Sequence, residues 1–235
     1  MRSDRGAAAV TALLRRWHAR HAAAHPLPLG THAYWQQAYA ATDRGRAPSE
    51  WFLEAAAAAD EVCTAHRLHG SGGETGALRA LHVGCGTSHL GAALADAFGP
   101  RLARVVNTDF SAAALATLEA ELAGRAEQEY LLSDMSSEGC ALPQADLVVD
   151  KGTLDAVVFA GAPSTANFLC AVRDCMAPGA VYVHFTEEPP DYRTEVIEAA
   201  FDAERWRIAT ATVEDDDSVP NTYFRYSVWR REDVG

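Results

Sequence analysis

The chain is nearly devoid of lysine. Of its 235 residues, 20 are lysine or arginine, and Lys151 is the single lysine among them. Lysine is normally one of the commonest residues. Codon usage that disfavours lysine explains the many arginines, but it leaves this one exception unexplained. A planar guanidinium cannot take the place of a compact ammonium at every site. The sequence therefore favours a functional role for Lys151, inside the segment DKGTLD at 150–155, over chance survival.

Other features that the sequence lacks argue against several classes of protein. No apolar run is long enough to span a bilayer. The five cysteines show neither metal-ligand spacing nor a paired framework, and the motifs HExxH and CxxC are absent, so no metal site is expected. The net charge of −12 argues against a general nucleic-acid binder. We therefore expect neither a nucleic acid nor a membrane as a partner.

Residues 1–30 differ from the rest of the chain. They contain five arginines against one aspartate, a net charge of +4, although the whole chain is acidic. Val10, Leu13, Leu14 and Trp17 share one face of a helix by their spacing. An arginine-rich amphipathic N-terminus is typical of a mitochondrial presequence, and an ordinary first helix fits the pattern equally well. We expect an N-terminal extension over 1–30, a possible presequence, followed by one domain over 31–235.

Strands alternate with helices after residue 76. Three helices are predicted before that point, over 7–24, 33–42 and 50–68, followed by a glycine-rich loop at 69–76. The predicted strands are 80–83, 103–107, 129–132, 146–149, 180–185, 206–213 and 222–229, and the helices between them are 88–98, 112–124 and 164–176. This alternation indicates an α/β fold with a doubly wound, mostly parallel sheet of seven strands. The last two strands suggest an antiparallel edge.

Polar or flexible residues stand at four successive strand ends, where ligands bind to such a sheet. Glycines in the turn at 84–86 allow the backbone to bend sharply and to approach a ligand. Asp109, Asp134 and Asp150 end the next three strands. The first of these acids occupies the position that binds ribose hydroxyls, and the second could accept from an adenine amino group. Each acid alone could equally be a loop carboxylate or a helix cap. Residue 89 is histidine rather than the third glycine of GxGxxG, which argues against a nicotinamide cofactor.

Four segments together resemble a known family. They are LHVGCGTS at 81–88, NTDFS at 107–111, SDM at 133–135 and DKGTLDA at 150–156. They resemble the seven-strand S-adenosylmethionine-dependent methyltransferases, which have a Rossmann-like fold. Two positions depart from the family pattern: Ser88 occupies the third glycine position, and His82 stands where an acid often precedes the first glycine. The resemblance implies S-adenosyl-L-methionine as the cofactor.

The family's cofactor contacts map onto matching positions of this chain. The resemblance implies nine contacts: Trp35, Tyr39, Trp51, Gly84, Asp109, Phe110, Asp134, Met135 and Lys151. The three aromatic residues before position 52 would close over the cofactor, and Gly84 would line its methionine end. Asp109 would bind the ribose with Phe110 beside it, and Asp134 and Met135 would frame the adenine. Ring faces attract cations such as a sulfonium. Without the resemblance, the aromatic residues would indicate core packing.

A narrower resemblance concerns the substrate. YWQQAY at 34–39, WF at 51–52 and DKGTLDA are similar to a branch of protein-lysine methyltransferases whose members modify elongation factor 1A or mitochondrial citrate synthase. FTEEPPDYR at 185–193 and NTYF at 221–224 are most similar to the citrate synthase group. The resemblance implies methylation of a protein lysine, with citrate synthase as substrate in the mitochondrial matrix. Elongation factor 1A in the cytoplasm is the alternative.

Three questions of function stay open at this point. Glu187, Glu188 and Asp191 could attract a basic substrate segment, or they could form a solvated loop. The sequence identifies no catalytic residue, and the transfer needs no covalent nucleophile. A non-catalytic cofactor-binding assembly factor and a small-molecule methyltransferase are the two alternatives to a protein-lysine methyltransferase.

Overall fold

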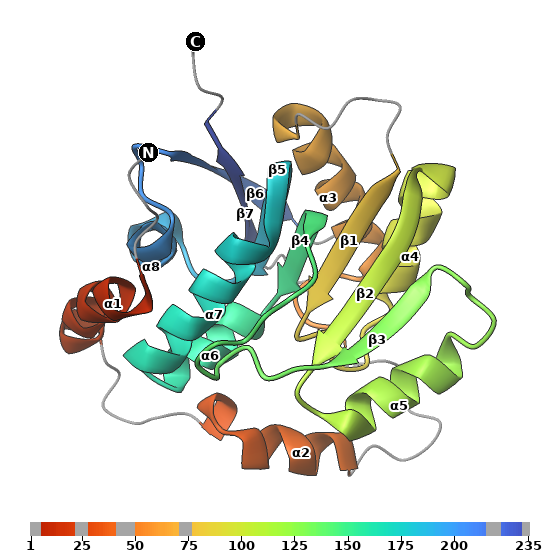
Figure 1. The fold of residues 1–235 in the computed structure, drawn as a ribbon, viewed down its shortest axis with the longest axis horizontal. Helices are drawn as coiled ribbons and strands as arrows, with labels where there is room; N and C mark the ends of the chain where they lie inside the picture. Colours follow the sequence, from red (N-terminus) through yellow and green to blue (C-terminus); the bar gives the residue numbers. More distant parts are fainter. Residues whose placement is uncertain (1–5, 22–27, 41–49, 71–76, 215–221, 232–235) are drawn as a thin grey trace.

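A seven-stranded sheet forms the centre of the computed structural model, which describes residues 6–21, 28–40, 50–70, 77–214 and 222–231 (Figure 1). The strands are β1 (Leu78–Val83), β2 (Leu102–Asp109), β3 (Gln128–Leu132), β4 (Ala145–Lys151), β5 (Met176–Thr186), β6 (Trp206–Glu214) and β7 (Thr222–Arg230). Their order is β3-β2-β1-β4-β5-β7-β6. The first five strands pair in parallel, and β7 is antiparallel to both β5 and β6. The predicted fold class is confirmed, including the antiparallel edge.

Helices cover both faces of this sheet. They are α1 (Ala7–His21), α2 (His32–Ala40), α3 (Ala55–His69), α4 (Leu90–Phe98), α5 (Ala112–Glu121), α6 (Thr153–Phe159), α7 (Ala162–Cys175) and α8 (Pro190–Ala200), with 3₁₀ turns η1 (Pro28–Gly30) and η2 (Gly99–Arg101). Successive side chains of a strand point to opposite faces. Leu78 and Ala80 of β1 therefore join a core with α3 and α4, whereas Leu81 and Val83 join a core with α6, α7 and α8.

Helix α1 is part of the second of these cores. Val10 and Leu14 are fully buried in it, and Leu13 and Trp17 pack against its edge. Figure 1 shows α1 beside α7 and α8. The apolar face that suggests a presequence thus packs against the methyltransferase domain predicted over 31–235. Residues 1–5 and 22–27 of the predicted extension lie outside the described residues, and its cleavage stays a prediction.

The structure corrects the start of one predicted helix and adds two helices that were not predicted. The helix expected from residue 50 begins at Ala55, because Phe52 has a positive φ of 65° and interrupts helical geometry before it. Helices α6 and α8 were not predicted. Helix α6 is short and follows β4 after a single glycine, and α8 begins in the segment EEPPD, whose two prolines suggest a loop. Most of the loop predicted at 69–76 lies outside the described residues.

Helix α2 has a distinctive place in the fold. It lies across the carboxyl ends of the parallel strands, at the bottom of the view in Figure 1. Ligands bind at this edge in doubly wound sheets, so α2 is positioned to cover a site there. None of the described helices is long and apolar enough to cross a membrane.

Candidate functional site

A cavity of about 590 Å³ lies between α2 and the carboxyl ends of the strands. This volume is typical of sites for small molecules and cofactors. All nine residues that the sequence predicts as cofactor contacts line it: Trp35, Tyr39, Trp51, Gly84, Asp109, Phe110, Asp134, Met135 and Lys151. The fold therefore brings together residues that are up to 116 positions apart in the chain. Their contact with a cofactor stays a prediction.

The three predicted aromatic residues form one continuous wall of the cavity. The ring centroids of Trp35 and Tyr39 are 5.9 Å apart, and those of Trp35 and Trp51 are 5.4 Å apart. The indole Nε1 of Trp35 donates to the carbonyl of Leu29 at 2.7 Å, which fixes the first ring. Such a wall can hold an apolar or cationic group against ring faces.

The glycine turn after β1 is tied to the end of β2. The carboxylate of Asp109 accepts from the backbone N–H of Gly86 at 2.9 Å and from that of Ser111 at 2.8 Å. Burial raises the pKa of Asp109, and these N–H groups oppose the shift. Both glycines of the turn have positive φ. A Cβ at Gly84 would lie 2.2 Å from Thr153 Oγ1, and one at Gly86 would lie 2.6 Å from the Tyr39 hydroxyl. Neither position can hold a side chain without moving a neighbour.

Phe110 and Asp134 are joined by a residue that the sequence did not single out. The ring of His32, at the start of α2, stacks on Phe110 with centroids 4.3 Å apart. Its Nε2 lies 3.5 Å from Asp134 Oδ2. The Asp134 carboxylate also accepts from Ser136 and Ser137, and although burial raises its pKa, these hydrogen bonds lower it overall. Asp134 therefore stabilises its own turn as well as lining the cavity.

Lys151 lies at the cavity wall with its ammonium turned into the protein. Its side chain is 2% exposed, donates to the carbonyl of Leu53 at 2.9 Å and pairs with the carboxylate of Glu50. Burial lowers the pKa of Lys151, and Glu50 opposes that shift. Lys151 thus holds the segment that carries Trp51 over the cavity. Glu50 was missed because nothing in the sequence links it to a residue 101 positions later.

Asp150 does not line the cavity, unlike the other two acids at strand ends. It is fully buried and accepts from the backbone N–H groups of Thr153 and Leu154, so it caps α6. The hydroxyl of Tyr182 donates to it at 3.0 Å, and Nδ1 of His184 lies 2.9 Å away. Burial would raise the pKa of Asp150, but these partners lower it. Here the interpretation as a helix cap is correct.

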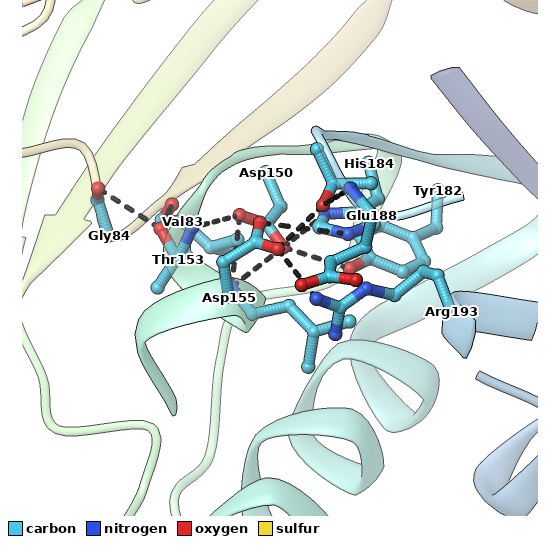
Figure 2. Close-up of polar contacts among 11 residues, drawn as sticks. Val83, Gly84, Asp150, Thr153, Asp155, Tyr182, His184, Glu188 and Arg193 are labelled. Carbon is cyan, nitrogen blue, oxygen red and sulfur yellow. Dashed lines mark hydrogen bonds and ion pairs between the residues drawn. The ribbon is translucent and has the colours of Figure 1, made fainter. Parts of the chain in front are cut away.

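Figure 2 shows a second acid, Asp155, gathered with these residues. Its carboxylate accepts from Arg193 and from Thr186. Arg193 is buried and belongs to the segment FTEEPPDYR, whereas Asp155 belongs to DKGTLDA. Two of the segments that carry the narrower resemblance therefore meet in one buried network. The exposed acids Glu187, Glu188 and Asp191 flank it and do not line the cavity.

Buried His82 makes a testable contribution to acid stability. Burial, assisted by the nearby charge of Lys151, lowers its pKa to about 4. In the unfolded chain its pKa is about 6.5, so there the imidazole becomes protonated at a higher pH than in the folded protein. The unfolded state then holds more protons, so the free energy of unfolding falls as pH drops through this window, by about 2 kcal/mol from pH 7 to pH 5. His82→Gln should lose that much less stability in urea unfolding over this range. Equal losses in both proteins would contradict the assignment.

The cavity has the chemistry of a site for a cationic nucleoside. Four carboxylates and one ammonium line it among the described residues, so its walls carry net negative charge: Glu50, Glu54, Asp109, Asp134 and Lys151. Aromatic rings and a buried acid at the ribose position complete the fit to an adenosyl sulfonium. No group of three or more histidine, cysteine or acidic residues in the described part of the chain could hold a metal ion.

Comparison with known proteins agrees with this geometry. The family model described as "Methyltransferase domain" matches residues 81–182. The solved structure of the N-methyltransferase NodS from Bradyrhizobium japonicum WM9, in complex with S-adenosyl-L-homocysteine, is similar with a TM-score of 0.56, 15% identity, and coverage of 87% of this chain and 100% of that one. A TehB-like S-adenosylmethionine-dependent methyltransferase from Corynebacterium glutamicum gives a TM-score of 0.54 at 14% identity, covering 87% and 100%. These structures bear on the fold alone.

The sheet, the glycine turn and the family match over residues 81–182 indicate the class of the S-adenosylmethionine-dependent methyltransferases. The names of two similar curated proteins give a reaction and a substrate as well as this class. The mitochondrial citrate synthase-lysine N-methyltransferase of Pongo abelii is 28% identical over 165 residues, covering 64% of this chain and 67% of the relative. That of Homo sapiens is 31% identical over 135 residues, covering 52% and 56%. The chain thus spans two thirds of one relative and little more than half of the other.

Proposed function

We propose that the chain transfers a methyl group from S-adenosylmethionine to a lysine side chain of citrate synthase. The observation that carries this proposal is the similarity to two enzymes named for that reaction. The meeting of DKGTLDA and FTEEPPDYR at Asp155 supports it, because the segments that resemble this branch occupy one place in the fold. The mitochondrial matrix is the proposed compartment, since both relatives are named as mitochondrial.

The reaction asks two things of the protein. When bound, S-adenosylmethionine supplies a methyl group activated by the sulfonium. The cavity must then hold the acceptor amine in line with that carbon, which replaces a rare encounter by a fixed approach. It must also favour the neutral amine, and removing water lowers the pKa of a lysine side chain. Trp35, Tyr39 and Trp51 supply apolar surface at this part of the cavity, which reduces the hydration of a group bound there, and the transfer requires no covalent nucleophile.

Incubation with labelled S-adenosylmethionine tests this function. Purified chain, citrate synthase and elongation factor 1A should give label on citrate synthase, located to a lysine by mass spectrometry. Label on elongation factor 1A alone would favour the cytoplasmic alternative. Label on small molecules of a lysate but on no protein would favour a small-molecule methyltransferase. Tight cofactor binding without any transfer would favour a non-catalytic assembly factor.

Asp109 provides a test of the cofactor site itself. Asp109→Ala should weaken S-adenosylmethionine binding by about 1.5–3 kcal/mol, because the ribose hydroxyls lose a charged acceptor. Calorimetry measures this loss, and thermal unfolding without cofactor shows how much stability the bonds to Gly86 and Ser111 contribute. Unchanged affinity in a folded variant would contradict the ribose assignment.

A further inference from the structure

The methionine end of the cavity lacks the acid that its position in the fold would supply. His82 is the second residue before Gly84, and its side chain lines the cavity while being 2% exposed. It cannot bind an ammonium as a carboxylate does, because burial keeps its imidazole neutral at physiological pH. If the cofactor's amino acid group is recognised by charge, the carboxylate must come from elsewhere.

The tautomer of His82 follows from a chain of three hydrogen bonds. Gln128 Nε2 donates to the carbonyl of Gly91 at 3.1 Å, which makes Gln128 Oε1 an acceptor. Asn107 Nδ2 donates to that oxygen at 2.9 Å, so Asn107 Oδ1 accepts from His82 Nδ1 at 3.3 Å. His82 Nε2 consequently carries a lone pair. It can accept one hydrogen bond, but it brings no negative charge.

Glu50 brings a carboxylate to the same place from a distant part of the chain. It accepts from the hydroxyl of Ser88 at 2.8 Å and from the backbone N–H of His89 at 2.9 Å. Both residues belong to the turn between β1 and α4, directly after Gly86. Its side chain is 11% exposed and lines the cavity. Burial would raise the pKa of Glu50, but Lys151 and these hydrogen bonds lower it, so the group is a carboxylate.

We propose that Glu50, assisted by the Nε2 lone pair of His82, binds the α-ammonium of S-adenosylmethionine in place of the missing acid. Lys151 is then a positioning residue. Its ammonium donates to Glu50 and to the Leu53 carbonyl, and so holds Glu50 in place. This assignment rests on the cofactor of the class and not on the identity of the methylated substrate.

Two ligands that differ in the amino acid group test the proposal by calorimetry. S-adenosylhomocysteine carries the ammonium, whereas 5′-methylthioadenosine keeps the adenosine and the thioether without it. Wild-type protein should prefer the first, and Glu50→Gln should reduce that preference about 10- to 100-fold, the loss of one hydrogen bond to a charged group. Its affinity for methylthioadenosine should stay within about twofold. Glu119→Gln removes the charge of an exposed acid in α5 that does not line the cavity; it is the matched control and should keep the preference.

In Glu50→Gln the buried Lys151 loses its carboxylate partner, and the variant could unfold. A double variant covers that case. Glu50→Gln with Lys151→Met removes both charges, and it should also lose the preference. The proposal would be overturned if Glu50→Gln lowered the affinity for both ligands equally, or if the double variant kept the wild-type preference. Glu50 would then serve only to cap α4. Failure of the wild type to bind S-adenosylhomocysteine would refute the cofactor itself. Binding with intact discrimination but no transfer to citrate synthase would refute the proposed substrate alone.

Discussion

Replacing Lys151 with arginine is expected to destabilise the fold and to remove most methyl transfer, although the charge is kept. The ammonium has one carboxylate and one carbonyl as partners and is almost fully enclosed. A guanidinium is wider and planar and has five donors, so it cannot occupy this space without leaving donors unpaired. Breaking a buried ion pair costs about 3–5 kcal/mol. We expect a loss approaching this range in chemical denaturation.

The matched control replaces a surface arginine with lysine. Arg79 is 45% exposed and pairs with Asp146 at 2.9 Å. Arg79→Lys should change the free energy of unfolding by less than about 1 kcal/mol, as surface ion pairs do. If Lys151→Arg were equally harmless and kept wild-type turnover, the survival of a single lysine would be chance within a codon-biased sequence.

Cofactor affinity should also fall in the folded fraction of this variant. Lys151 holds Leu53 and Glu50, which flank Trp51, so its replacement moves the wall of the cavity as well as the cap of α4. Affinity for S-adenosylhomocysteine should therefore fall along with stability. A variant that is destabilised but binds with wild-type affinity would show that Lys151 serves the fold alone.

The sequence predicts much of this site because strand ends are local features. Asp109 and Asp134 follow short apolar runs, and parallel strands bring their carboxyl ends to one edge of the sheet. Asp150 follows the same pattern but points away from the cavity, where it caps α6. Side-chain direction at a strand end depends on the turn that follows. The short helix α6 was not predicted, so the sequence could not decide between a helix cap and a residue of the cavity for Asp150.

The remaining parts of the site depend on contacts between distant segments. Glu50 stood in a stretch expected to be helical, and its partners Ser88 and Lys151 lie 38 and 101 residues away. His32 stacks on Phe110, and no periodicity in the sequence predicts this contact. Helix α8 is different: Pro190 and Asp191 in its first turn are ordinary signals of a helix start. These signals favour a helix at α8, whereas one sequence carries no local signal for the two long-range contacts.

The second large effect is expected at α1. Leu14 is fully buried against the core that contains α7 and α8, so Leu14→Ala should lower the free energy of unfolding by about 2–5 kcal/mol. Leu68→Ala is the matched control, because this leucine is also helical but 65% exposed. It should cost less than about 0.5 kcal/mol. Equal, small effects at both positions would show that α1 does not pack as described.

The packing of α1 limits where a mitochondrial presequence could be cleaved without loss of stability. Cleavage near residues 20–30 would remove α1, including Val10 and Leu14, and would expose the core surface that these side chains cover; the burial of each such side chain contributes about 1.5–3 kcal/mol. We therefore expect a chain beginning at residue 31 to unfold at a lower temperature than the full chain. If the protein is imported and stays stable, its mature N-terminus should precede α1, as mass spectrometry of the protein recovered from mitochondria would show.

The proposed targeting role of α1 and its packing can be tested separately, because its exposed arginines lie apart from its buried apolar side chains. Arg15 and Arg16 are exposed, so Arg15→Ser with Arg16→Ser should leave thermal stability unchanged while it halves the net charge of residues 1–30 from +4 to +2, a charge that presequences depend on. Imaging fusions of this variant and of the wild type should then show loss of mitochondrial signal in the variant alone. Diffuse cytosolic signal from both would contradict the mitochondrial address and favour elongation factor 1A as the substrate. A mature chain that lacks α1 and keeps full stability would instead contradict its role in the core.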